Sequence, residues 1–129
     1  MWLTALFVLL FDQLSKWFAV QQGWVVYNPG LSFGVGQESS RIVLTVILIV
    51  GVGVAWKVLK QERQSAPIVA GLFFGGAVSN ILDRVLQGAV IDWIPLFLLP
   101  LKNNLADWAI FIALCIWLVQ LLQAKQNRK

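Results

Sequence analysis

The fold and the chemistry of this chain centre on residues 75–107, which read GGAVSNILDRVLQGAVIDWIPLFLLPLKNNLAD. This stretch holds three of the six acidic residues of the protein, Asp83, Asp92 and Asp107. Placing a carboxylate at the centre of a membrane helix costs roughly 2.5–3.5 kcal/mol, so acids beside hydrocarbon are rare and mark function. We therefore predict that Asp92 and Asp107 form a two-carboxylate hydrolytic site at one face of a membrane.

The composition of the whole chain is that of a membrane protein. Hydrophobic residues make up 59% of its 129 residues, and the mean hydropathy is +0.77. A soluble domain of this length cannot bury so much apolar surface, so lipid is expected to surround much of it. The length allows one domain. The net charge of +4 comes from basic residues that form no long run, which indicates membrane topology and argues against a nucleic-acid partner.

Several kinds of catalytic chemistry are excluded by residues that the chain lacks. It contains no His and one Cys, Cys115, which lies alone in an apolar run. Ser-His-Asp and Cys-His catalysis are therefore excluded, as are zinc sites of the usual His-bearing kinds. We expect no metal and no cofactor, so any reaction must use carboxylates, Lys16 or a hydroxyl group.

Four apolar segments predict four transmembrane helices, at about residues 2–20, 42–59, 67–86 and 105–122. The connections are then two loops on one side, 21–41 and 87–104, and on the other side a loop at 60–66 and a basic tail at 123–129. The first segment lacks a basic start and contains Asp12, so it is expected to be a retained helix and not a cleaved signal peptide. The predicted class is an all-α membrane protein with a small extracytoplasmic β-hairpin or sheet and a short interfacial segment.

The two longer loops each carry a structural signal. Residues 28–30 read Asn-Pro-Gly, a turn sequence, and lie between the β-prone segments 24–27 and 31–33, so a hairpin or small sheet on the membrane surface is expected. In the other loop, the apolar segment 96–101 is bounded by prolines and is expected to lie along the membrane interface beside Trp93.

Polar residues inside the first and third spans leave alternatives open. Asp12 and Lys16 are four residues apart and either form a structural ion pair inside the bundle, or Lys16 acts as a base on a hydroxyl such as that of Ser15. Asn80, Asp83 and Arg84 share one face near the end of the third span. Asp83 is expected to anchor that end at the interface, whereas Asn80 and Arg84 either do the same or contact substrate.

Further alternatives concern the small residues of the third span and the start of the fourth. Gly75 and Gly76 suit close helix packing, and we also consider that they leave room for lipid or another helix. Asn104 is expected to cap the fourth span with Asp107 at its third position, so Asp107 could serve only as a cap and dipole partner. Asp92 could likewise be an exposed loop carboxylate.

The basic residues predict the sidedness of the protein. They gather between the second and third spans and after the fourth, at Lys57, Lys60, Arg63, Lys125, Arg128 and Lys129. The positive-inside rule then places both termini in the cytoplasm. With four spans, Asn28, Asp92 and Asp107 all fall on the extracytoplasmic side, although the spans were chosen without reference to them. Asn28 there either caps its turn or binds an extended peptide.

Two carboxyl groups held close together in a poorly solvated place share a proton, because both cannot ionise cheaply. The ionised group then takes a proton from water as the water attacks an amide carbonyl, and the other protonates the leaving nitrogen. That Asp92 and Asp107 lie close together is a prediction, since 15 positions separate them in the chain.

Four motifs occur in order along the chain: Asp-Gln-Leu-Ser-Lys at 12–16, Asn-Pro-Gly-Leu-Ser-Phe-Gly at 28–34, the stretch 75–92, and Asn-Leu-Ala-Asp at 104–107. Together they resemble the lipoprotein signal peptidases (signal peptidase II) of bacteria over essentially the whole chain. The resemblance implies a four-helix aspartyl peptidase of the cytoplasmic membrane. Its substrates would be prolipoproteins with a diacylglyceryl group on a Cys, and cleavage on the amino side of that Cys would release the signal peptide.

The resemblance also implies roles for individual residues. Asp92, in a Gly-x-Val-x-Asp pattern, and Asp107, in Asn-x-Ala-Asp, are the implied catalytic pair. The implied substrate-binding residues are Asn28, Gly30, Asn80 and Arg84. The implied structural polar residues are Asp12, Lys16, Asp83 and Asn104. A monomer in contact with membrane lipid and inhibited by globomycin is expected, with no nucleic-acid partner.

This sequence departs from the family pattern at two positions beside the aspartates. Asn103 stands where Phe usually precedes the Asn, and Trp93 stands where Phe usually follows the catalytic Asp. The stretch between the two aspartates is also short and apolar. Both aspartates are kept, and a lid of different shape, with altered lipid preference and inhibitor affinity, is expected.

Two other classes of function fit a small membrane protein with buried charges. One is a transporter or proton relay, but the acids gather at one face and no inverted repeat is evident. The other is a non-enzymatic membrane assembly factor that uses its Gly-rich helix to bind partners.

Overall fold

The computed structural model describes residues 1–30, 41–97 and 99–126. The helices are α1 Trp2–Gln21, α2 Arg41–Val58, α3 Lys60–Ser65, α4 Pro67–Gln87 and α5 Leu105–Gln126. The strands are β1 Val26–Asn28, β2 Val90–Asp92, β3 Ile94–Pro95 and β4 Lys102–Asn103. The predicted mostly helical fold is confirmed. The short helix α3 replaces the loop that the sequence predicted at 60–66.

Within the described residues, three helices are long and apolar enough to cross a membrane, namely α1, α4 and α5. The apolar part of α2, Ile42–Val58, is shorter. Most large apolar side chains on the outer faces of these helices are exposed, as expected of helices whose surroundings are lipid. The predicted membrane class therefore agrees with the structure.

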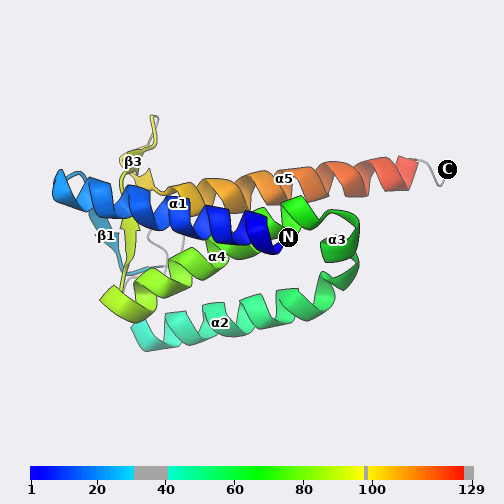
Figure 1. The fold of residues 1–129 in the computed structure, drawn as a ribbon, viewed down its shortest axis with the longest axis horizontal. Helices are drawn as coiled ribbons and strands as arrows, with labels where there is room; N and C mark the ends of the chain where they lie inside the picture. Colours follow the sequence, from blue (N-terminus) through cyan, green and yellow to red (C-terminus); the bar gives the residue numbers. More distant parts are fainter. Residues whose placement is uncertain (31–40, 98, 127–129) are drawn as a thin grey trace.

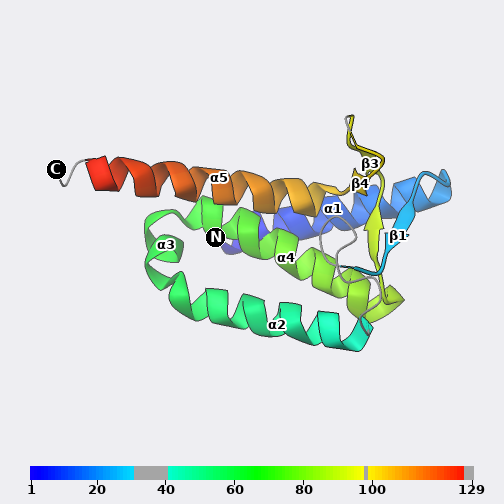
Figure 2. The same ribbon diagram turned by 180° about the vertical axis from the view of Figure 1, so that it is seen from behind.

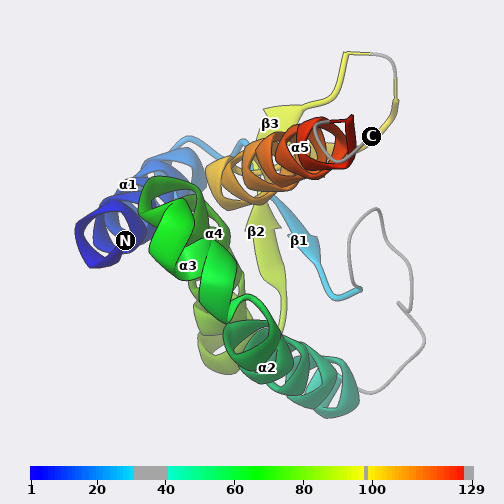
Figure 3. The same ribbon diagram turned by 90° about the vertical axis from the view of Figure 1, so that its right-hand side faces the viewer.

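Three of the helices, α1, α4 and α5, form one packed group, and α2 packs against it mainly through α4. α4 packs against both α1 and α5, whereas α2 lies next to α4 on the side away from α1 and α5 (Figures 1 and 3). All four strands lie at one end of the helices, near the end of α1 and the start of α5. The N-terminus and α3 lie toward the other end (Figures 1 and 2). Asn28 in β1, Asp92 in β2 and Asp107 at the start of α5 consequently lie at the same end of the molecule.

Glycines allow α4 to approach its two neighbours closely. A Cβ atom built at Gly75 would lie 2.6 Å from the backbone oxygen of Ala5 in α1, and one at Gly76 would lie 2.5 Å from that of Ala106 in α5. Real Cβ contacts are not this short, so only glycine fits. The prediction of close packing is confirmed, and the alternative that these glycines leave room for lipid is wrong, because backbone fills the space.

The ends of α4 follow ordinary rules of helix termination. Pro67 occupies the first helical position, where its missing N–H is not needed. Gly88 follows the last residue with φ 72°, a left-handed conformation that glycine adopts without strain. Its backbone N–H bonds to the carbonyl of Arg84 at 3.0 Å. This turn sends the chain directly into β2, which brings Asp92 back toward α4.

The small sheet forms between the two loops. β1 pairs antiparallel with β2, with Val26 opposite Asp92 and Asn28 opposite Val90. The predicted partner of β1, residues 31–33, lies outside the described residues, so the sheet is confirmed but its predicted strand pairing is not. The partner comes from 62 positions further along the chain because β2 is fully buried and fixed to α4. Local propensity cannot indicate such a pairing.

A second antiparallel pair, β3 with β4, forms a hairpin whose outer turn includes the apolar segment predicted at the interface. Phe97 in this turn is completely exposed, and Leu99 is more than half exposed. These exposed apolar side chains lie at the end of the β3–β4 hairpin, and the interfacial position predicted for the segment stays a prediction.

Candidate active site

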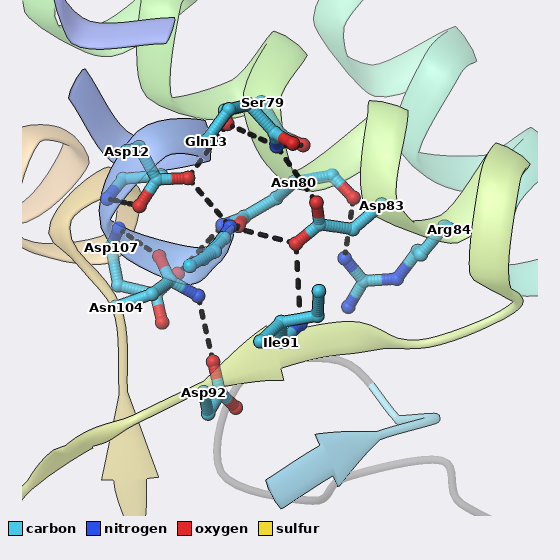
Figure 4. Close-up of polar contacts among 12 residues, drawn as sticks. Asp12, Gln13, Ser79, Asn80, Asp83, Arg84, Ile91, Asp92, Asn104 and Asp107 are labelled. Carbon is cyan, nitrogen blue, oxygen red and sulfur yellow. Dashed lines mark hydrogen bonds and ion pairs between the residues drawn. The ribbon is translucent and has the colours of Figure 1, made fainter. Parts of the chain in front are cut away.

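Asn104 joins the two aspartates that the sequence singled out. It is the cap of α5, and its side-chain Oδ1 accepts a hydrogen bond from the backbone N–H of Asp107 at 2.9 Å. Its Nδ2 donates to Oδ1 of Asp92 at 2.7 Å (Figure 4). The predicted cap is confirmed. Because one amide contacts both residues, Asp92 at the end of β2 and Asp107 in the first turn of α5 belong to one polar site.

Each aspartate also accepts a hydrogen bond from a further asparagine. Nδ2 of Asn28 in β1 donates to Oδ2 of Asp92 at 3.1 Å, so both oxygens of that carboxylate are hydrogen-bonded. Nδ2 of Asn80 in α4 donates to Oδ1 of Asp107 at 2.7 Å. Asp92 is 3% exposed, which rules out its alternative role as an exposed loop carboxylate. Asp107 does more than cap a helix, since its own carboxylate is held by Asn80.

Burial raises the pKa of the Asp92 carboxyl group. Removal from water raises the pKa of this carboxyl from its ordinary value to about 6, and the charge of Asp107 acts in the same direction. The hydrogen bonds from Asn28 and Asn104 and the charge of Lys16 lower the pKa, but they do not offset the burial. Asp92 can therefore both release and take up a proton near neutral pH.

A buried ion cluster formed by Asp12, Lys16 and Asp83 lies next to the site and contacts it through Asn80. Nζ of Lys16 lies 2.6 Å from Oδ2 of Asp12 and 2.7 Å from Oδ2 of Asp83, and all three side chains are at most 1% exposed. The structural alternative for Asp12 and Lys16 is thereby supported. Ser15 instead donates to the backbone carbonyl of Asp12 at 2.7 Å, and no bond joins it to Lys16. Asp83 does not anchor an interface as predicted, because it is buried in this cluster.

The cluster connects four elements. Oδ1 of Asp12 in α1 accepts the backbone N–H of Ala106 at the start of α5, at 2.9 Å. Oδ2 of Asp83 in α4 accepts that of Ile91 in β2, at 3.2 Å. The chain segments that carry Asp92 and Asp107 are thus fixed to α1 and α4 by carboxylates that belong to neither.

Gln13 and Ser79 complete the cluster and were not identified from the sequence. Ser79 donates to Oδ2 of Asp12 at 2.6 Å, and Nε2 of Gln13 donates to Oδ1 of Asp83 at 2.7 Å and to Ser79 at 2.9 Å (Figure 4). Their spacing from charged residues in the sequence could have identified them. Ser79 is four residues before Asp83 in α4, and Gln13 is three residues before Lys16 in α1, so each shares a face of an apolar helix with a charged residue.

Arg84 lies against the backbone that follows Asn28. Its Nη2 donates to the carbonyl of Gly30 at 2.6 Å, and its Nη1 lies 3.3 Å from the carbonyl of Asn80. The backbone N–H of Gly30 in turn donates to Oδ1 of Asn28 at 3.1 Å. These four residues, which the sequence proposed for substrate binding, are therefore linked to the two aspartates through Asn28 and Asn80.

Two apolar cavities meet at the aspartates, and both are lined by Asn28, Asp92, Asp107 and Ile110. The first, here the hairpin groove, has a volume of about 350 Å³ between the β3–β4 hairpin and α5, with Leu96, Lys102, Trp108 and Phe111 in its wall. The second, here the α2–α4 groove, has a volume of about 610 Å³ and is lined by α2, α4 and the start of α5.

The chain is similar to known proteins over nearly its whole length. Residues 4–123 match the model of the family described as signal peptidase (SPase) II. The lipoprotein signal peptidase of Polynucleobacter necessarius is 36% identical, covering 88% of this chain and 84% of that protein. The one from Moorella thermoacetica is 32% identical, covering 98% and 97%.

The fold has relatives among solved structures. A bacterial membrane enzyme solved by the in meso method superimposes with a TM-score of 0.76 at 25% identity, covering 98% of this chain and 90% of that one. The similarity in sequence thus extends to the arrangement of helices and strands. This chain belongs to the signal peptidase II family, the bacterial membrane aspartic proteases that remove signal peptides from prolipoproteins.

Proposed function

We propose that Asp92 and Asp107 form the catalytic dyad of this protease. In this proposal the dyad hydrolyses the amide bond on the amino side of a Cys that carries a diacylglyceryl group. The observation that supports it best is the shared polar site, in which Asn104 bonds to both residues and both carboxyl groups line the same two cavities. Family membership gives the prolipoprotein substrate class.

The proposed reaction needs one water and one proton shared by the dyad. The ionised carboxylate accepts a proton from water as the water oxygen bonds to the amide carbonyl carbon. The protonated carboxyl group then donates its proton to the amide nitrogen, the carbon–nitrogen bond breaks, and the amino group of the lipidated Cys leaves. A carboxyl with a pKa of about 6, as at Asp92, suits both roles near neutral pH.

The three asparagines are proposed to hold the two carboxylates in this geometry. Each has its carbonyl oxygen held by a donor, namely the N–H of Gly30 for Asn28, the N–H of Asp107 for Asn104 and Nζ of Lys16 for Asn80. Each amide nitrogen must then face an aspartate, because an amide has its donors on one side only. Asn28 and Asn80, with Gly30 and Arg84, are proposed to contact the substrate backbone as well.

We further propose that α1, α2, α4 and α5 all cross the membrane, with both termini in the cytoplasm and the dyad on the extracytoplasmic side. The supporting observation is the set of basic residues on α3, at the end of α2 and at the end of α5. The protein is proposed to act as a monomer and to be inhibited by globomycin, as the family resemblance implies. Membership of a protease family argues against the transporter and assembly-factor alternatives.

The test is cleavage of a lipobox peptide with a diacylglyceryl-modified Cys, in detergent or liposomes. Asp92→Asn and Asp107→Asn are each expected to lower kcat/KM by a factor of roughly 10²–10⁴, the usual contribution of general acid–base catalysis. Glu62→Gln, on α3 at the opposite end of the molecule, is the matched control and should retain activity. Thermal melts must show that each variant is folded. Continued cleavage by both folded Asp variants would refute the dyad.

A further inference from the structure

The α2–α4 groove is polar at one end and apolar along the rest of its length. Asn80, Arg84, Asp92 and Asp107 line it at the end that carries the dyad. Away from them the lining side chains that the structure describes are apolar. On α4, Phe73 lies seven residues before Asn80, which is about 10 Å along the helix axis. The groove therefore runs from the proposed dyad toward the other end of the helices.

One face of α2 forms a wall of this groove, and Gly51 leaves a position without a side chain on that face. Ile47, Leu48 and Gly51 are spaced so that they fall on the same side of α2. A Cβ atom built at Gly51 would have no described heavy atom within 4 Å, unlike those at Gly75 and Gly76, which meet backbone. A glycine inside a helix costs about 0.5–1 kcal/mol relative to Ala. Close packing does not explain Gly51, whereas an open groove does.

The chemistry of the groove limits what can occupy it. An extended peptide would leave its amide groups unpaired along the apolar walls, which costs several kcal/mol per group in a membrane. A saturated hydrocarbon chain has no such groups. Its polar attachment would then lie at the end lined by Arg84 and the dyad.

We propose that the α2–α4 groove receives an acyl chain of the diacylglyceryl group of the substrate, and that Gly51 determines the length of chain admitted. This inference rests on the proposed function, since it takes the scissile bond to lie at Asp92 and Asp107. In this proposal the signal peptide binds in the hairpin groove, whose wall includes the polar side chains Lys102 and Asn103.

The selectivity expected of this groove is steric. Moving a hydrocarbon chain from lipid into an apolar groove gains little, because lipid tails are as apolar as the groove walls. A side chain that fills the groove must therefore act by excluding the chain. Gly51→Leu should block a long chain and leave a short one, which ends near the dyad, unaffected.

The experiment compares two substrates that share one lipobox peptide and differ in the acyl chains on the Cys, dibutanoylglyceryl and dipalmitoylglyceryl. Gly51→Leu is expected to lower kcat/KM for the dipalmitoyl substrate about tenfold, as overpacking does, and to leave the dibutanoyl value within about twofold. Gly53→Leu is the matched control. Gly53 lies two residues away, also has no described atom within 4 Å of a built Cβ and does not line the groove, so both values should stay within about twofold.

The outcomes separate this inference from the proposed function. If the unaltered protein cleaves neither substrate, the proposed function fails and this inference fails with it. If it cleaves both and Gly51→Leu changes the two values equally or not at all, only the inference fails. An independent measurement uses a dipalmitoyl substrate with a diazirine at the chain end. Cross-links to residues 47–52 of α2 are expected, and cross-links confined to 108–114 of α5 would overturn the assignment.

Discussion

Lys16 determines which way the amide of Asn80 faces. Its three ammonium protons are directed to Asp12, Asp83 and Oδ1 of Asn80, the last at 3.1 Å. An ammonium group can only donate, so the carbonyl oxygen of Asn80 must face Lys16 and its NH₂ must face Asp107. A cation in the first helix thereby fixes the orientation of a carboxylate in the last one without touching it.

Lys16→Met is expected to destabilise the protein strongly. It leaves the carboxylates of Asp12 and Asp83 buried without a cation, and breaking a buried pair in this way costs roughly 3–5 kcal/mol. A melting temperature in detergent roughly 10 °C lower should result. Lys57→Met, which removes an exposed lysine from the end of α2, should leave the melt unchanged. Equal melting temperatures for the two variants would show that the cluster contributes little.

The sequence identified nine polar residues and Gly30 for this region, and the structure places them in one connected site. They could be found because a charged or amide side chain is conspicuous in an apolar helix and because the motifs match a family. The second contact of Asn104, to Asp92, could not be predicted. It depends on how the β3–β4 hairpin returns the chain, and the segment between the two residues, which are 12 positions apart, contains no signal for that path.

At the scale of helices and strands, the glycines of α4 and those of α2 differ in whether a neighbouring helix contacts them. Gly75 and Gly76 are fitted against the backbone of α1 and α5, whereas Gly51 and Gly53 in α2 face open space. From sequence all four are glycines in apolar helices. Only the position of the neighbouring helix decides which of them permits contact, so the sequence left close packing and open room as alternatives for Gly75 and Gly76.

Two matched substitutions test this distinction, and opposite signs are expected. Gly76→Ala should lower the free energy of unfolding by roughly 1–3 kcal/mol, because its Cβ would meet the rigid backbone of Ala106. Gly53→Ala should raise it by about 0.5–1 kcal/mol through the better helix propensity of Ala. Unfolding in a denaturing detergent series measures both. A change of the same sign in the two variants would contradict the assignment of packing to Gly76.

At the scale of the whole molecule, the two ends of the helical group are held by different forces. At the end that carries the dyad, the ion cluster and asparagines join α1, α4, α5 and β2. Further along α4, toward α3, apolar and aromatic side chains pack together, among them Phe74 and Trp117. Hydropathy predicted the apolar segments because it is local. It could not predict that α2 joins the group mainly through α4, since all four segments are similarly apolar.

Of the four long helices, α2 is the shortest and has the least length with which to cross a membrane. Its 18 residues span about 27 Å at 1.5 Å per residue, slightly less than the roughly 30 Å of a hydrocarbon core. Basic residues at its end and in α3 nevertheless favour a cytoplasmic position for that connection. If α2 crosses, the residues just after α1 and those in α3 must lie on opposite sides of the membrane.

Cysteine labelling decides this, because the chain has a single native Cys. In a Cys115→Ala background, Gln22→Cys after α1 and Gln61→Cys in α3 place thiols at exposed positions on the two sides of α2, and Lys125→Cys reports the end of α5. A membrane-impermeant maleimide added to spheroplasts should label position 22 directly and positions 61 and 125 only after permeabilisation. Labelling of 22 and 61 from the same side would mean that α2 does not cross. The reverse pattern would place the dyad on the cytoplasmic side and contradict the proposed orientation.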